Sequence, residues 1–252
     1  MLCRGVLPNS RQPFRTIPHR CPNGPGGSMN PTVAIVLLWL AFGVSHVVLS
    51  SFWLRGKLAV ALGENAFLGF YSLISLATFV PLVVFYFGHK HQGVLLWAPG
   101  VGGAGRGLVF VGMAVAFVLL VSGVLTPSPS SISASTDSKG QKPKGVQKLT
   151  RHAVFMAMGI FGMIHLVPNG YATDVAFFSG FPLFVLLVSI HQDRRKLRPA
   201  NSEYRAFYAA TPLVPFTGAK TLQGIKELDW RAVALSIFLV LLVRHYHVAW
   251  FG

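Results

Sequence analysis

Long apolar runs constrain this chain more than any other feature of its sequence. Six runs can be delimited, at 31–54, 67–87, 108–125, 150–167, 172–190 and 230–251. Each is close to the ~20 residues that a helix needs to cross the hydrocarbon core of a bilayer. The runs are continuous, whereas strands of a membrane barrel alternate between apolar and polar residues. Since backbone groups in lipid must be hydrogen-bonded internally, the sequence predicts an all-α fold, a polytopic membrane helical bundle of about six transmembrane helices.

The distribution of charge predicts the orientation of this bundle. Only 12% of the residues are charged, against about 25% in a soluble domain. Counted from Met29, 15 of the Lys and Arg residues fall in the loops 55–66 and 126–151 and in the region 191–231. Lys90, Arg106 and Arg244 fall on the other side. The positive-inside rule then places both chain ends outside and the basic loops in the cytoplasm or its equivalent. The net charge of +15 is explained by this topology, so the expected partner is the lipid bilayer and not nucleic acid.

Two segments are expected to lie outside the packed bundle. Residues 1–28 hold four arginines, five prolines and no acid, which predicts a disordered extension. It is either a mis-assigned start, with Met29 as the first residue, or a targeting segment. The first interpretation fits a bacterial inner membrane, and a transit peptide would fit a plastid membrane. The domain is expected to span 29–252, with a Ser/Pro/Lys-rich flexible cytoplasmic loop at 127–148.

Histidines inside the apolar runs are the main candidates for chemistry. His46 and His165 each lie within a run, and an ionisable residue in a membrane helix is a functional-site candidate. Imidazole is also an axial ligand of haem iron. The alternative is a histidine bonded to a nearby hydroxyl or carbonyl group. At 1.5 Å per residue, His46 lies ~12 Å and His165 ~20 Å above the cytoplasmic helix ends. Ligands of one iron need similar depths, so helix tilt would have to absorb a mismatch of ~8 Å.

Other polar and small residues leave further alternatives open. Arg151 and His152 begin the fourth run, where they either bind an anionic group, such as a haem propionate or a headgroup, or form an ordinary interfacial helix start. Gly159 and Gly162 serve either close helix packing or the entry of a flat macrocycle. None of the seven acids falls well inside a run, so an intramembrane carboxylate relay is not expected. Both cysteines lie in residues 1–28, so residues 29–252 have no thiol for a disulfide or a covalently attached haem.

Beyond the membrane spans, residues 201–211 predict a short interfacial helix with Asn201 or Ser202 as its N-cap. Tyr204, Phe207 and Tyr208 would lie on one side of this helix.

The chain from about Met29 to Lys220 resembles the NnrU family, and within it the branch of 15-cis-ζ-carotene isomerases. The resemblance rests on the order and spacing of short pieces. They are SH at 45–46, GENAFLGFYSLISL at 63–76, YFGHKHQGVLLW at 86–97, LTRH at 149–152, GMIH at 162–165 with NG at 169–170, QDRRK at 192–196 and EYRAFYAATPLVPF at 203–216. Two positions depart from the pattern: Gly162 replaces a cysteine of the isomerases, and Ala153 replaces the proline of the motif TRHP.

The resemblance implies an integral membrane haem-b enzyme of carotenoid biosynthesis, a cis–trans isomerase acting on the 15-cis double bond of ζ-carotene. It implies that His46 and His165 are catalytic and are the axial ligands of the haem iron. Its partners would be a hydrophobic polyene substrate and an electron donor that reduces the haem. Two alternatives stay open. One is a non-catalytic NnrU-type protein that supports nitrite or nitric-oxide reduction in denitrification. The other is an S-adenosylmethionine-dependent membrane methyltransferase, which the pattern of Arg151, His152 and Tyr204 also resembles.

Overall fold

The computed structural model describes residues 29–98, 102–130, 142–199 and 204–251, and their regular structure is helical apart from one isolated bridge. The predicted extension 1–28 lies outside the described residues. Six longer helices form the bundle: α1 (Pro31–Leu49), α3 (Glu64–Gly88), α4 (Gly103–Leu125), α6 (Ala153–Leu166), α7 (Ala172–Leu197) and α10 (Trp230–Phe251). Four short helices join them: α2 (Phe52–Leu62), α5 (Val146–Leu149), α8 (Tyr204–Ala210) and α9 (Thr221–Lys226). The predicted all-α fold class is confirmed.

Each predicted apolar segment forms a helix, but the first boundary was wrong. Segment 31–54 is not one helix, because α1 ends at Leu49 and α2 begins at Phe52. The hydroxyl of Ser51 accepts a hydrogen bond from the backbone N–H of Leu54 at 3.4 Å and so caps the new helix. The predicted short helix at 201–211 is α8, whereas its expected N-cap lies outside the described residues.

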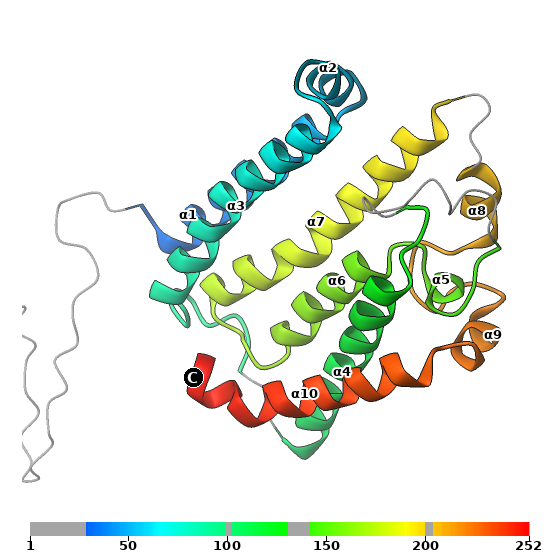
Figure 1. Ribbon diagram of the computed structural model, residues 1–252. Coiled ribbons are helices and arrows are strands. Elements are labelled where there is room, and N and C mark those ends of the chain that lie inside the picture. Colours follow the sequence, from blue (N-terminus) through cyan, green and yellow to red (C-terminus); the bar gives the residue numbers. More distant parts are fainter. Residues whose placement is uncertain (1–28, 99–101, 131–141, 200–203, 252) are drawn as a thin grey trace, which may run out of the picture.

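The six longer helices pack in one row, in the order α3, α1, α7, α6, α4, α10 (Figure 1). The short helices α2, α5, α8 and α9 lie at those ends of the long helices that carry the basic loops, and we call this side the basic end of the bundle. The opposite end, formed by the loops 89–98 and 167–171, is called the outer end. Among α1, α3, α4 and α7, helix α7 is the most enclosed, with 56% of its most apolar stretch buried inside the protein.

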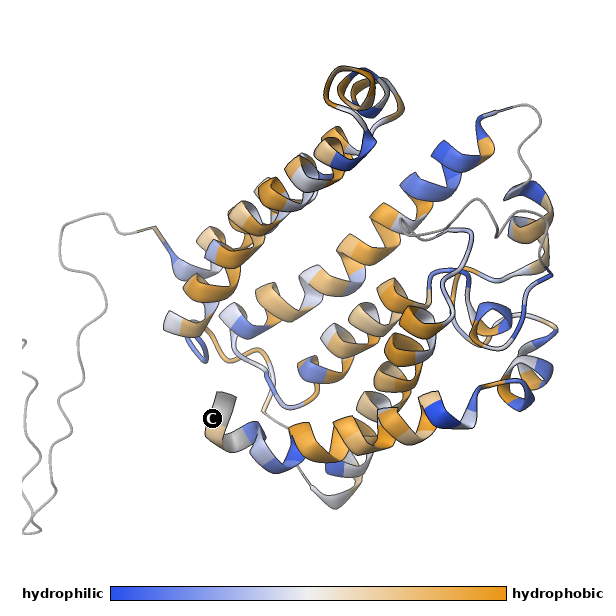
Figure 2. Cartoon of the chain, in the orientation of Figure 1, coloured by the Kyte–Doolittle hydropathy of each residue, from blue (hydrophilic) through white to orange (hydrophobic). Residues whose placement is uncertain are grey.

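Four helices, α1, α3, α4 and α7, are long and apolar enough to span a membrane by length and composition. Figure 2 shows that hydrophobic residues cover the middle of the row and polar residues gather at its ends. Helix α6 is apolar but has 14 residues, which is ~21 Å of helix and shorter than a hydrocarbon core. Helix α10 carries Arg244, His245 and His247 near its end, which shortens its apolar run. The protein is thus a polytopic membrane protein, and the described residues hold four full-length spans where six were predicted.

Aromatic residues form the core between α1, α3 and α7. Phe177, Phe181 and Phe184 lie on α7 and surround the buried indole of Trp39 on α1. The Nε1 atom of Trp39 donates a hydrogen bond to the carbonyl oxygen of Phe177 at 3.0 Å. This buried bond fixes the position of α1 along α7.

Small residues let α6 approach α7 closely. A Cβ atom on Gly162 would lie 2.5 Å from the carbonyl oxygen of Phe178, and one on Gly159 would lie 2.9 Å from a methyl group of Val185. Neither contact is possible in a relaxed structure, so both positions require glycine here. Of the two roles that the sequence left open for these glycines, the structure shows close helix packing.

The segment 127–148, predicted to be a flexible cytoplasmic loop, is packed at both of its described ends. Ser128 and Ser130 are buried, and so are Val146 and Lys148 around the short helix α5. Residues 131–141 lie outside the described residues. A polar composition alone could not reveal that the ends of this segment cover the basic end of the bundle.

Candidate functional site

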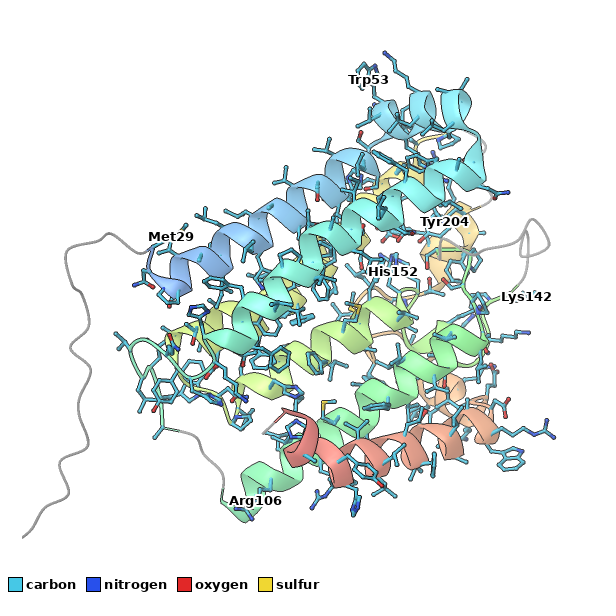
Figure 3. All side chains as sticks on the ribbon, turned by 60° about the vertical axis from the view of Figure 1, so that its left-hand side comes forward. Met29, Trp53, Arg106, Lys142, His152 and Tyr204 are labelled. Carbon is cyan, nitrogen blue, oxygen red and sulfur yellow. The ribbon has the colours of Figure 1, made fainter. Side chains whose placement is uncertain are left out.

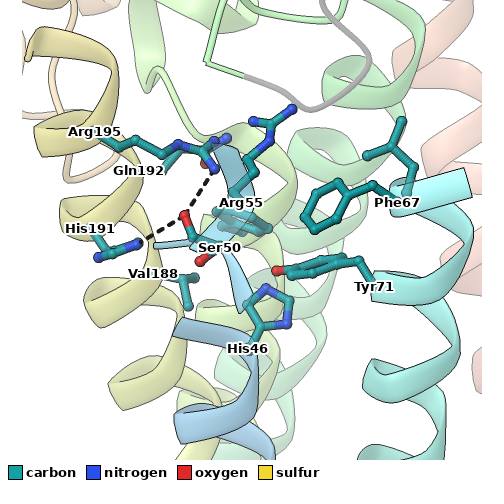
Figure 4. Close-up of a pocket in the computed structure, with 11 residues that line it drawn as sticks. His46, Ser50, Arg55, Phe67, Tyr71, Val188, His191, Gln192 and Arg195 are labelled. Atoms are coloured by element: carbon teal, nitrogen blue, oxygen red, sulfur yellow. Dashed lines mark hydrogen bonds between the residues drawn. The ribbon is translucent and has the colours of Figure 1, made fainter. Parts of the chain in front are cut away.

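His46 lies beside a cavity of about 50 Å³ at the basic end of the bundle (Figure 4). The cavity lies between α1, α3 and α7, and the side chain of Phe155 on α6 contributes to its wall. Its lining is half polar and half apolar, comprising His46, Ser50, Arg55, Phe67, Leu68, Tyr71, Phe155, Val188, His191, Gln192 and Arg195. A cavity of this size can hold a few water molecules or one small polar group.

The imidazole of His46 is held by aromatic rings. Its ring centre lies 4.8 Å from that of Tyr71, 5.1 Å from that of Phe184 and 5.5 Å from that of Phe42. Its Nδ1 atom lies 3.4 Å from the hydroxyl oxygen of Ser75 on α3. In the described part of the chain, no hydrogen-bond partner of Nε2 is found, so this nitrogen could serve as a ligand or hydrogen-bonding atom.

His165 lies near the outer end of α6. Its Nδ1 atom is 2.8 Å from the carbonyl oxygen of Phe161, an acceptor, so Nδ1 carries the proton and donates. The ring stacks on Phe178 of α7, with ring centres 4.9 Å apart. Trp97 closes this end by donating from Nε1 to the carbonyl oxygen of Leu166 at 3.1 Å. His165 therefore belongs to the outer end, as the sequence predicted.

The structure does not bring His46 and His165 together. Their α7 contacts, Phe184 and Phe178, are six residues apart, which is ~9 Å along the helix. This offset agrees with the mismatch of ~8 Å expected from counting residues. The rings of Phe161 and Phe181 also pack against each other in this part of the core, with centres 5.2 Å apart.

A haem between these two histidines does not fit this packing. Imidazole–metal bonds are about 2 Å long, so two axial ligands of one iron approach within about 4 Å of each other. That separation is much smaller than the offset along α7. The glycine face of α6, where a macrocycle was one alternative, is filled by α7. Separately, the described residues include no group of three or more His, Cys, Asp or Glu that could hold a metal ion directly, which does not bear on a haem with two axial ligands. The assignment of His46 and His165 as haem ligands stays a prediction.

A second polar site lies at the same end of the bundle and is built around the carboxylate of Asp193 on α7. Nε of Arg151 donates to Oδ2 at 2.8 Å, Nε2 of His152 contacts Oδ1 at 2.7 Å, and the phenol of Tyr204 donates to Oδ1 at 2.6 Å. The side chains of Arg151, His152 and Asp193 are 7%, 2% and 6% exposed. Figure 3 shows the labelled His152 and Tyr204 in this region. We call these four residues the Asp193 cluster.

The Asp193 cluster shows what Arg151 and His152 contact in the fold. They were expected to bind a haem propionate or a headgroup, or to mark an interfacial helix start, and α6 does begin directly after His152. Both side chains are also buried and bound to a carboxylate of the protein, and Arg151 donates from Nη1 to the carbonyl oxygen of Thr211 at 2.8 Å. Burial raises the pKa of the Tyr204 phenol, and its hydrogen bond to Asp193 raises the pKa further. Tyr204 therefore remains a hydrogen-bond donor throughout the physiological pH range.

The outer end of α7 carries a similar arrangement around Asp174, whose side chain is fully buried. The phenol of Tyr86 donates to Oδ1 at 3.0 Å, the backbone N–H of His91 donates to the same oxygen at 3.0 Å, and Nδ1 of His91 lies 2.8 Å from Oδ2. Asp174 and Asp193 are 19 residues apart in the sequence, which is ~28 Å of helix and close to the thickness of a hydrocarbon core.

Both buried aspartates were missed by the sequence analysis, which dismissed the acids because none lies well inside an apolar run. The sequence does carry one signal, because Asp174 and Asp193 lie at the two ends of one apolar span. The partners of each aspartate, a tyrosine and a histidine, come from elsewhere in the chain. The distances between those partners along the sequence hide the clusters until the fold is known.

Comparison with known proteins gives one family and two relatives. A family model described as NnrU protein matches residues 34–252. The chain is 26% identical over 199 residues to "15-cis-zeta-carotene isomerase, chloroplastic" of Arabidopsis thaliana, an alignment that covers 75% of this chain and 51% of the relative. It is 26% identical over 203 residues to the protein of the same name from Zea mays, covering 78% and 52%. The chain thus spans about half the length of the curated relatives that it matches. No solved structure matches it significantly.

Proposed function

We propose that this chain, which belongs to the NnrU family, is an integral membrane cis–trans isomerase of a carotenoid-type polyene. The proposal is supported by the similarity to two proteins named as 15-cis-zeta-carotene isomerases, which covers at least 75% of this chain. By the same comparison we propose the 15-cis double bond of ζ-carotene as the substrate bond, and a plastid membrane as the site of action.

The single structural observation that carries this proposal is the surroundings of His46. A hydrocarbon polyene offers only a π-system, and aromatic rings are suitable partners for it because they present apolar faces. Phe42, Tyr71 and Phe184 surround His46 at distances of 4.8–5.5 Å between ring centres. The aromatic residues of α1, α3 and α7 would therefore contact the polyene beside one imidazole.

Haem b is a separate proposal, which rests on the family resemblance alone. Because the packing does not fit a haem between His46 and His165, we derive no step of the reaction through it. Its test is a Soret band that survives purification and is lost in His46→Ala or His165→Ala. If the purified, folded protein shows no such band, the haem proposal is wrong, whereas the isomerase proposal is judged by its own assay.

The isomerase proposal is tested by feeding tri-cis-ζ-carotene to the purified protein in lipid nanodiscs under reducing conditions. Chromatography should show the 15-cis isomer decreasing and the 15-trans isomer increasing. His46→Ala should lose this activity, and the matched control His245→Ala, an exposed histidine on α10, should keep it. An unchanged isomer ratio with the folded wild-type protein would reject the proposal. Neither denitrification support nor methyl transfer is favoured by a contact among the described residues.

A further inference from the structure

The cavity beside His46 carries positive charge that its surroundings do not balance. Arg55 and Arg195 both line it, and none of the 11 lining residues is an acid. Figure 4 shows the two guanidinium groups on the same side of the cavity, and they are close enough to repel each other. Glu64, which is outside the lining, forms an ion pair with Arg55. One carboxylate is therefore present for two guanidinium groups, and the guanidinium of Arg55 lies over the ring of Phe67, 5.7 Å from its centre.

Capping of α1 explains only part of this arrangement. Nη1 of Arg195 donates to the carbonyl oxygen of Ser50 at 3.1 Å, and Nε2 of His191 lies 3.4 Å from the same oxygen. Cations at a helix C-terminus are favourable. One such bond uses one of the five N–H donors of a guanidinium group. The second arginine, Arg55, has no role in capping. It pairs with Glu64, and this single carboxylate leaves one of the two positive charges unbalanced.

The position of the cavity indicates which anion reaches it. Helix α2 begins directly after the cavity residue Ser50 and exposes Phe52 and Trp53, at 55% and 67%. Nζ of Lys57 lies 3.8 Å from the centre of the Trp53 ring. Exposed tryptophan together with lysine on a short helix is typical of the membrane–water interface. The two arginines are therefore at the depth of lipid headgroups.

We propose that Arg55 and Arg195 bind the phosphate group of an anionic phospholipid in this cavity. Guanidinium groups suit phosphate because their N–H donors match its oxygen atoms in pairs. The carboxylate of Glu64 orients Arg55, and the Ser50 carbonyl orients Arg195. The cavity shares His46 and Tyr71 with the region proposed to hold the polyene, but Arg55 and Arg195 have no part in the proposed isomerisation.

Native mass spectrometry of the purified full chain tests the proposal. Phosphatidylglycerol is titrated into detergent micelles, with phosphatidylcholine and inorganic phosphate in parallel arms. Arg195→Gln and Arg55→Gln should each weaken binding of the first phosphatidylglycerol about tenfold or more, since one charge-assisted interaction is lost. Arg194→Gln is the matched control, because Arg194 is the exposed neighbour on α7 and does not line the cavity.

The outcomes separate the possible ligands. Tight phosphatidylglycerol binding that falls in both cavity variants and stays within about twofold in Arg194→Gln supports the proposal. Equal binding to all four proteins overturns it, because the charge would then act as a diffuse surface. If inorganic phosphate shows the same dependence on Arg55 and Arg195 and phosphatidylglycerol does not, the ligand is a free anion and the lipid assignment is wrong. Should Arg195→Gln fail to fold, Arg55→Gln gives the same decision.

Discussion

Removing the charge of Asp193 should cause a large loss of stability. In Asp193→Asn the side chain keeps its shape, but the guanidinium of Arg151, only 7% exposed, loses its counter-charge. Breaking a buried ion pair by changing one partner costs about 3–5 kcal/mol, because the remaining charge stays buried without compensation. An asparagine can still accept a hydrogen bond, so we expect the lower end of this range, about 3 kcal/mol.

The measurement is thermal or denaturant unfolding of the purified protein in a fixed detergent. A loss of about 3 kcal/mol corresponds to a fall in Tm of about 6–12 °C for a chain of this size. Asp229→Asn is the matched control, since Asp229 is exposed and only accepts a hydrogen bond from the backbone N–H of Arg231. Asp229 directly precedes α10, and Asn and Asp are nearly equivalent as residues that cap the start of a helix. The change in the free energy of unfolding should therefore stay within about 0.5 kcal/mol.

A double variant separates charge from packing. Arg151→Met combined with Asp193→Asn removes both charges and keeps an acceptor for His152 and Tyr204, so it should be less destabilised than Asp193→Asn alone. If Asp193→Asn instead costs less than about 1 kcal/mol, the carboxylate is effectively solvated. The Asp193 cluster would then not be the closed, buried network that its distances and exposures describe.

Two further predictions follow from the packing of α6 and from the ion pair between Lys148 and Glu227. Gly162→Ala should destabilise the protein by about 1–3 kcal/mol, because its Cβ would lie 2.5 Å from a backbone oxygen of α7. The control Gly69→Ala on α3 has open space around the new Cβ and should be neutral or stabilising. Equal unfolding temperatures of the two variants would contradict the close approach of α6 to α7. The hydrogen bond from Lys148 lowers the pKa of Glu227 below its ordinary value of 4.5, so this pair contributes stability above pH 4.5 that is lost as the pH falls through the lowered pKa. Glu227→Gln should therefore show a smaller loss of Tm than the wild type on acidification below that pH, and parallel curves for the two proteins would show that the pair contributes nothing.

The helices of this protein could be predicted from sequence because lipid imposes a simple rule on them. A continuous apolar run must become a helix, and α3, α4, α7 and α10 follow their runs within a few residues, apart from extensions at polar ends. The break between α1 and α2 could not be predicted in this way. Phe52, Trp53 and Leu54 are as apolar as the residues before them, and the capping geometry of Ser51 decides the boundary.

The candidate sites were less predictable because they depend on side chains that meet only in three dimensions. The sequence pointed to His46 but placed it ~12 Å above the cytoplasmic end of a helix that would run to residue 54. Because α1 ends at Leu49, His46 lies in its last turn, beside the cavity. It could not indicate that Arg55 and Arg195, 140 positions apart, would line the same cavity. Nor could it show that Arg151 and His152 both contact the carboxylate of Asp193 inside the protein.

The contacts along α7 show that His46 and His165 lie towards different ends of the bundle. Helix α1 is fixed to α7 by the bond from Trp39 to the Phe177 carbonyl, and α6 is fixed by the contact of Gly162 with the Phe178 carbonyl. Bringing the two imidazoles to one depth needs a slide of ~9 Å, which is more than one helical turn. Such a slide would break a buried hydrogen bond or separate the glycine face from α7, and interiors packed at this density do not deform continuously. His46 therefore lies beside the cavity at the basic end, while His165 lies at the outer end that Trp97 closes.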